Sequence, residues 1–123
     1  IEGRGDQKWT INYLKKYKFN ICFENSSTIG YVTEKIIQSM YVNSIPIYWG
    51  AEDVNNDFNT ASFINYHDYE NDEEFINKIL EVDNDYEQYI NLLSEPWFNQ
   101  NKVPENVLPE NVLKFIVGVL NRK

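Results

Sequence analysis

The stretch FNICFENSSTIGYVTEKIIQSMYVNSIPIYWG, residues 19–50, decides the fold of this chain. It begins and ends with short, mostly apolar runs, Phe19–Phe23 and Ile45–Trp49, whose length is typical of buried strands. Between these runs, apolar residues recur at helical spacing, which predicts a helix over residues 31–41 with one apolar face. A strand, a helix and a second strand in this order predict a parallel sheet with a right-handed crossover, and hence an α/β fold.

The rest of the sequence extends the same pattern. Residues 62–66 predict a third strand, and helices are expected at residues 8–17, 72–81 and 84–94. The motif PENVL occurs twice in succession, and its second copy, with Pro109 in the first turn, predicts the start of a last helix. All three strands are expected to be buried. Because a parallel sheet is normally covered on both faces, they predict part of a larger doubly wound domain.

Composition narrows the possible functions. In 123 residues, 42% of them hydrophobic and 15% aromatic, the chain has enough apolar side chains for one folded domain. A formal net charge of −8 argues against a nucleic acid as partner, since a phosphate backbone is bound mainly by Lys and Arg. The single cysteine, Cys22, excludes an internal disulfide and a Cys-rich zinc site, and its apolar surroundings predict a buried, unreactive thiol. No run approaches the ~20 apolar residues of a membrane span.

Small polar residues and a glycine, residues 24–30, separate the first strand from the helix. In parallel sheets, ligands bind beyond the carboxyl ends of the strands, where a helix N-terminus favours an anion such as phosphate. Gly30 permits a positive φ, and Glu34 and Lys35 lie ~100° apart on the expected helix. A carboxylate that binds sugar hydroxyls beside an ammonium that binds phosphate describes a nucleotide-sugar site. The alternative, an ordinary capped helix with a solvated Lys35, remains open on spacing alone.

Other candidate sites are weaker. The chain lacks the glycine motifs of P-loop and dinucleotide-binding proteins. His67 and Asp68 are adjacent in sequence, so a structural histidine is favoured over an acid–base pair. Residues 83–85, Asp-Asn-Asp, have the D-x-D spelling of metal-dependent sugar transferases, but their place between two expected helices favours a helix cap, and no metal site is expected. Residues 48–50, Tyr-Trp-Gly, fit either an aromatic platform for a sugar or base, or the core.

Two long motifs carry a family resemblance. YKFNICFENSSTIGYVTEKII, residues 17–37, and SIPIYWGAEDVNNDFNTASFINYHDY, residues 44–69, strongly resemble the C-terminal, donor-binding half of α-1,3-fucosyltransferases. These enzymes transfer L-fucose from GDP-fucose to a hydroxyl of N-acetylglucosamine or glucose, with inversion. The resemblance implies part of the C-terminal domain of a GT-B type glycosyltransferase, with a Rossmann-like parallel sheet of about three strands flanked by helices.

By motif position, the resemblance assigns four residues to donor binding. Lys35 would neutralise the pyrophosphate of GDP, and Glu34 would bond to hydroxyls of ribose or fucose. Tyr31 would line the same pocket, and Asn25 would contact the donor from the preceding loop. Secondary contacts, or a role in shaping the loop, are implied for Ser26, Gly30 and Thr33.

The same resemblance places the catalytic base outside this chain. In this family, the carboxylate that deprotonates the acceptor hydroxyl and the residues that recognise the oligosaccharide acceptor belong to the N-terminal domain. We therefore assign no catalytic residue here, and expect the isolated chain to bind GDP weakly and to be inactive. GDP-fucose is the donor substrate, and no cofactor or metal is expected to be required. At Ile29 the family often has Pro or an aromatic residue, a difference that bears on the shape of the loop.

These assignments divide the chain into three parts. Residues 1–16 form an N-terminal segment with a helix, residues 17–100 a donor-binding α/β domain, and residues 101–123 a C-terminal helical segment. Residues 1–4, IEGR, are spelled like a protease-cleavage linker and carry no functional weight. No targeting signal is visible, so the expected location is the cytoplasm or the periphery of the inner membrane in a bacterium, and the Golgi in a eukaryote.

The alternative is a truncated, non-catalytic module that forms a homo-oligomer or binds a partner through exposed apolar faces. Residues 112–120 are apolar on most sides, and without an N-terminal domain against them such a face would be exposed. Membrane association is expected to be weak or absent, because only Lys114, Arg122 and Lys123 are basic in this part of the chain.

Overall fold

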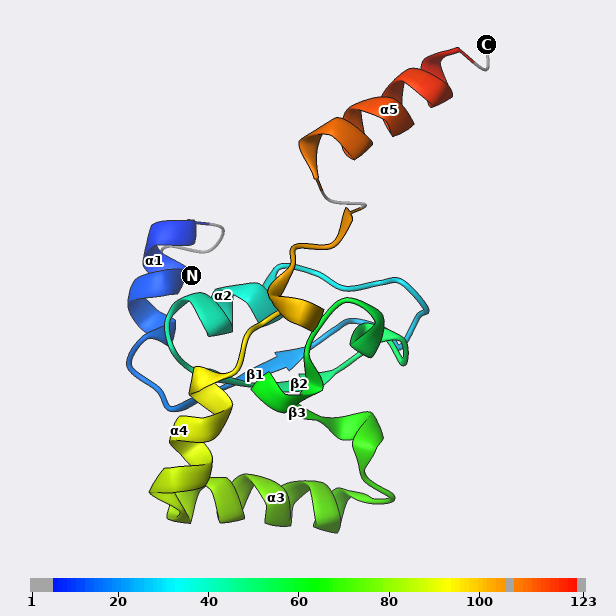
Figure 1. Ribbon diagram of the computed structural model, residues 1–123. Helices are drawn as coiled ribbons and strands as arrows, with labels where there is room; N and C mark the ends of the chain where they lie inside the picture. The colour runs from blue at the N-terminus through cyan, green and yellow to red at the C-terminus, as the bar shows by residue number, and fades with distance from the viewer. Residues whose placement is uncertain (1–5, 106–107, 122–123) are drawn as a thin grey trace.

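A three-stranded parallel sheet is the centre of the computed structural model, which describes residues 6–105 and 108–121 (Figure 1). Its order is β1 (Phe19–Phe23), β2 (Ile45–Trp49) and β3 (Ile64–Asn65). Strand β1 pairs with β2 along its whole length, whereas β3 pairs only with Ile47 and Tyr48 of β2. The predicted α/β fold with a parallel sheet is therefore confirmed, although the third strand is shorter than expected because 3₁₀ turns flank it.

Five helices lie in the described part of the chain: α1 (Gln7–Leu14), α2 (Lys35–Tyr41), α3 (Asp72–Asn84), α4 (Tyr86–Ser94) and α5 (Pro109–Leu120). Short 3₁₀ turns occupy Val54–Asn56, Thr60–Ser62, Tyr66–Asp68 and Asn99–Asn101. Figure 1 shows α2 on one side of the sheet, α3 and α4 on the other, and α5 projecting away from both. Over the residues that are described, no helix has the length and apolar character needed to cross a membrane.

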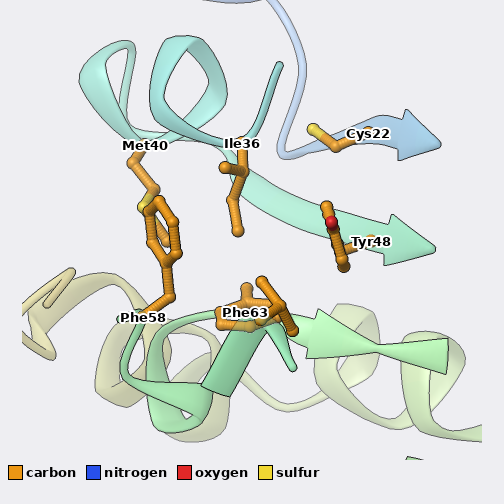
Figure 2. Packing of buried hydrophobic residues seen from close by; sticks show 7 residues of the cluster. Cys22, Ile36, Met40, Tyr48, Phe58 and Phe63 are labelled. Atoms are coloured by element: carbon orange, nitrogen blue, oxygen red, sulfur yellow. The ribbon is translucent and has the colours of Figure 1, made fainter. Parts of the chain in front are cut away.

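Each face of the sheet has its own cluster of buried side chains. On the α2 side, Ile36 and Met40 pack over the sheet together with Cys22, Tyr48 and Phe63 (Figure 2). The cluster on the other face comprises Ile45, Ile47, Ile64, Phe75 and Val82. The prediction of a buried thiol is confirmed, since Cys22 is 2% exposed and burial raises its pKa to about 12. This central sheet with a helical layer on each side fixes where the strand ends, and the loops after them, are found.

Strand β1 departs from the expectation of full burial. Its residues alternate, so that Asn20 and Cys22 are buried while Ile21 is 73% exposed and Phe23 is 42% exposed. The core cluster under α3 and α4 is built on β2 and β3, and of β1 only Phe19 packs against it. Strand β1 lies at the edge of the sheet, and one of its faces is largely uncovered, as expected for part of a larger domain.

Helix α2 begins later than predicted. The apolar spacing favours a start at Tyr31, whereas the helix begins at Lys35 with Glu34 as its N-cap. Two local features oppose a helix before that point. Gly30 has a φ of +76°, and the hydroxyl of Thr33 donates a hydrogen bond to Oε1 of Glu24. Residues 31–34 consequently belong to the loop that follows β1.

Candidate functional site

The loops after the three strands meet at the carboxyl edge of the sheet. The carbonyl oxygen of Gly50, directly after β2, accepts a hydrogen bond of 2.8 Å from the hydroxyl of Ser27 in the loop after β1. The Nε2 atom of His67, in the turn after β3, lies 2.8 Å from the same oxygen. One backbone carbonyl therefore joins all three loops at the edge where ligands of parallel sheets bind. The interpretation of His67 as a structural residue agrees with this contact.

Glu24 lies beneath the loop after β1 and is almost fully buried, with 4% of its surface exposed. Its backbone N–H donates to the carbonyl of Trp49 at 2.8 Å, which continues the pairing of β1 with β2. Its Oε1 accepts a hydrogen bond of 2.9 Å from the hydroxyl of Thr33, whereas its buried Oε2 has no partner among residues 6–105 and 108–121. Sequence reasoning missed this residue. The signal was the alternation of strand β1, because Asn20, Cys22 and Glu24 share the inward face.

Gly30 gives the loop its turn. Its φ of +76° lies in the left-handed region, so of the two uses expected of this glycine, a positive φ or close backbone approach, the structure shows the first. Its N–H donates to Oδ1 of Asp53 at 2.9 Å, so that the loop after β2 holds the turn in place. The N–H of Tyr31 donates to the carbonyl of Thr28 at 3.0 Å and closes the same turn.

The four predicted donor contacts lie along this loop and at the start of α2. Asn25 and Glu34 are exposed, Tyr31 is 39% exposed, and Lys35 is half-buried. Within the described residues, the polar side-chain atoms of these four have no hydrogen-bond or salt-bridge partner, so they are free to meet a ligand. The hydroxyls of Ser26 and Thr33, in contrast, are bonded inside the loop: Ser26 pairs with Thr28 at 2.9 Å.

Glu34 and Lys35 differ in their surroundings. Glu34 occupies the N-cap position of α2, but its carboxylate does not bond to the free N–H groups there, so it is not a side-chain cap. Glu34 instead borders a cavity of about 490 Å³, which Lys35 does not line. The cavity combines the carboxylates of Glu34, Asp53 and Asp57 with apolar side chains, including Val32, Ile37, Phe58 and Phe98. Because the described residues that line it include three carboxylates and no lysine or arginine, the cavity suits a neutral, hydroxyl-bearing group and repels a phosphate.

Two further sequence candidates, Tyr48 and Asp85, have structural roles. Tyr48 is fully buried, and its hydroxyl accepts the N–H of Ala51 at 3.1 Å, so it belongs to the core and is not a platform for a sugar. Burial, with a smaller contribution from the negative charge of Glu24, raises the pKa of Tyr48 to about 12. Asp85 of the Asp-Asn-Asp stretch caps α4 by accepting the N–H groups of Glu87 and Gln88, which confirms the interpretation as a cap. Nowhere in the described chain do three or more metal-ligating side chains converge.

Comparison with known proteins gives the family. Residues 2–113 match the model of glycosyltransferase family 10 (fucosyltransferase), C-terminal region. The chain is 42% identical over 103 residues to the alpha-(1,3)-fucosyltransferase FucT of Helicobacter pylori, a match that covers 77% of this chain and 22% of that protein. It superposes with a TM-score of 0.83 and 39% identity on a crystal structure of an alpha1,3-fucosyltransferase with GDP, covering 90% of this chain and 34% of that one. A structure with GDP-fucose gives a TM-score of 0.82 at the same identity, over 89% of this chain and 34% of that one.

The chain thus spans only part of the relatives that it matches, 22% of the bacterial enzyme and 34% of the solved chain. The comparisons confirm the expected fold, a part of a GT-B type glycosyltransferase, and the resemblance seen in the two sequence motifs. The division at residues 16–17 and 100–101 stays a prediction. By the family match and the structural similarity together, the chain belongs to glycosyltransferase family 10, the fucosyltransferases, and matches the C-terminal region of that family.

Proposed function

We propose that this chain is the donor-binding part of a fucosyltransferase. The complete enzyme would move L-fucose from GDP-fucose to a hydroxyl of an acceptor that contains N-acetylglucosamine or glucose, in α-1,3 linkage and with inversion. The observation that carries the proposal is the row of unpaired polar side chains, Asn25, Tyr31, Glu34 and Lys35, at the carboxyl edge of the sheet. Its support is the similarity to structures described as alpha1,3-fucosyltransferases with GDP and with GDP-fucose.

The chemistry divides between the two residues at the start of α2. The departing GDP carries growing negative charge as the bond to fucose breaks, and a nearby cation stabilises that charge. Lys35 supplies the cation, since its ammonium has no acidic partner among the described residues. Glu34 accepts hydrogen bonds from hydroxyls of ribose or fucose, and the cavity beside it has room for such a neutral group. The general base and the acceptor site belong to the rest of the enzyme, and the proposed transfer requires no metal or cofactor.

Calorimetric titration of the chain with GDP tests the assignment of Lys35. Loss of a hydrogen bond to a charged group costs about 1.5–3 kcal/mol, so Lys35→Ala should weaken GDP binding by about tenfold or more. Lys15→Ala is the matched control, because Lys15 is an exposed lysine that follows α1. Equal affinity of the Lys35→Ala variant and the unmodified chain would contradict the assignment. Fucosyl transfer by this chain alone would contradict the placement of the base elsewhere.

A second candidate, a non-catalytic module that self-associates or binds a partner, is favoured by one observation. Helix α5 carries large apolar side chains that are exposed, among them Leu113 at 62% and Leu120 at 61%. Helix α5 also projects away from the sheet and its flanking helices (Figure 1). Such a surface favours association with another apolar surface. The two candidates make opposite predictions for GDP, which only the donor-binding part should recognise.

A further inference from the structure

We infer that Glu24 and Thr33 form a partly buried clasp that positions the donor-binding side chains. The inference rests on the proposed function, since the side chains in question are the predicted donor contacts. The hydroxyl of Thr33 donates to Oε1 of Glu24 at 2.9 Å, and this bond joins the two ends of the loop after β1. Asn25 follows the first member of the clasp directly, and Glu34 follows the second. Neighbouring Cα atoms are only about 3.8 Å apart, so Asn25 and Glu34 stay close to Glu24 and Thr33. By holding Glu24 and Thr33 together, the clasp therefore limits the distance between these two donor contacts.

Glu24 is the fixed member of the clasp. Its N–H is bonded to the carbonyl of Trp49 at 2.8 Å, which anchors its backbone to β2. Its side chain is held against Gly50, where a Cβ atom would lie only 2.5 Å from its Cγ. The carboxylate therefore stays beneath the loop, and Thr33 is the member whose position depends on the hydrogen bond.

The unpaired second oxygen of Glu24 makes the clasp sensitive to loss of the Thr33 hydroxyl. Oε2 is buried and has no partner among the described residues. The hydroxyl of Thr33 is therefore the one described side-chain group that donates a hydrogen bond to this carboxylate. A buried carboxylate that loses its donor is strongly driven toward water. Removal of the hydroxyl should therefore open the loop and displace Asn25 relative to Glu34 and Lys35. In this scheme Thr33 acts through its bond to Glu24, as a positioning residue.

Three variants separate the effect of the Thr33 hydroxyl from the effects of side-chain shape and of the Glu24 charge. Thr33→Val keeps the shape and removes the hydroxyl, Thr33→Ser restores the hydroxyl, and Glu24→Gln keeps an oxygen that accepts the bond while removing the charge. We expect Thr33→Val to weaken GDP binding about tenfold, and the Ser and Gln variants to stay within about twofold of the unmodified chain. Thr10→Val is the control, since it removes a threonine hydroxyl of α1 that is bonded to the carbonyl of Asp6 and not to Glu24.

Amide hydrogen exchange of the ligand-free chain gives a readout that does not depend on GDP. In Thr33→Val, the amides of Gly30 and Tyr31 should exchange faster, while that of Ile47 in β2 should be unchanged. Unchanged loop exchange in Thr33→Val would overturn the clasp. Equal losses of affinity in the Val and Ser variants, or in the Val and Gln variants, would also overturn it, because a retained hydroxyl or a retained acceptor oxygen would then not preserve binding. An unmodified chain that does not bind GDP would overturn the proposed function, and the exchange data would still decide the clasp.

Discussion

The side chain of Glu24 fills the space that a side chain at Gly50 would occupy. A Cβ atom at Gly50 would lie 2.5 Å from Cγ of Glu24, and 2.6 Å from the hydroxyl oxygen of Tyr48. Both neighbours are buried side chains that are held by their own hydrogen bonds, so neither can move aside without losing a contact. The glycine is required here for close approach, in contrast to Gly30, where the positive φ is the reason.

Gly50→Ala is therefore expected to destabilise the chain. Inserting a methyl group into a well-packed site costs about 1–3 kcal/mol, which thermal or urea unfolding would measure. Gly118→Ala is the matched control, because no atom of the described residues lies within 4 Å of a Cβ at Gly118 in α5. There the substitution should be neutral or stabilise by up to about 1 kcal/mol, since alanine favours a helix. Equal stabilities of the two variants would show that the packing around Gly50 is loose.

Stability should decline at alkaline pH. Burial raises the pKa of Cys22 from 9.0 to about 12, and that of Tyr48 from 10.0 to about 12. In the unfolded chain both groups lose their protons at lower pH, so above pH 9 the unfolded state binds fewer protons than the folded state, and rising pH favours unfolding. The stability that comes from keeping these groups neutral is complete below pH 9 and is lost progressively up to pH 12.

Urea unfolding measured between pH 8 and about pH 11 would detect this decline. When the free energy of unfolding is plotted against pH, Cys22→Ala should flatten the part of the decline that begins near pH 9, because the variant has no thiol to ionise in the unfolded state. A variant whose curve has the same slope as that of the unmodified chain would assign the decline to other groups.

Helix α5 is expected to drive association if nothing covers it. Leu113 and Leu120 are more than half exposed, and Ile116 and Val117 are each 47% exposed. Sedimentation velocity should show a mass that increases with concentration, and replacement of both leucines by lysine should shift the chain toward monomer. Leu80→Lys serves as the control, because this leucine of α3 is 52% exposed but lies outside α5. A monomer at high concentration in the unmodified chain would contradict the prediction.

Periodicity predicted much of the fold. The first two strands have the predicted bounds because each is a compact apolar run ended by polar residues or glycine, and α5 begins at Pro109 as the repeated motif indicated. The start of α2 could not be predicted in the same way. It depends on a hydrogen bond between Thr33 and Glu24, nine residues apart, and spacing of apolar residues contains no information about such a contact.

The candidate site was predictable only in part. The loop, Gly30 and the polar character of the strand end follow from local sequence, whereas the roles of the individual donor contacts came from the family resemblance. The cavity beside Glu34 was not foreseen, because Phe58 and Phe98 reach it from segments 40 residues apart in the chain. The exposed face of β1 was also missed, since an apolar strand has the same sequence whether or not a layer covers it.

The shared carbonyl of Gly50 has a thermodynamic consequence. Ser27 and His67 both bond to it, so the loops that follow all three strands become ordered when the sheet forms. The conformational entropy of ordering this edge is then lost during folding and not during association with a ligand. A ligand at this edge therefore meets a preorganised backbone, and its affinity is reduced mainly by the ordering of its own groups and of the exposed side chains that bind it.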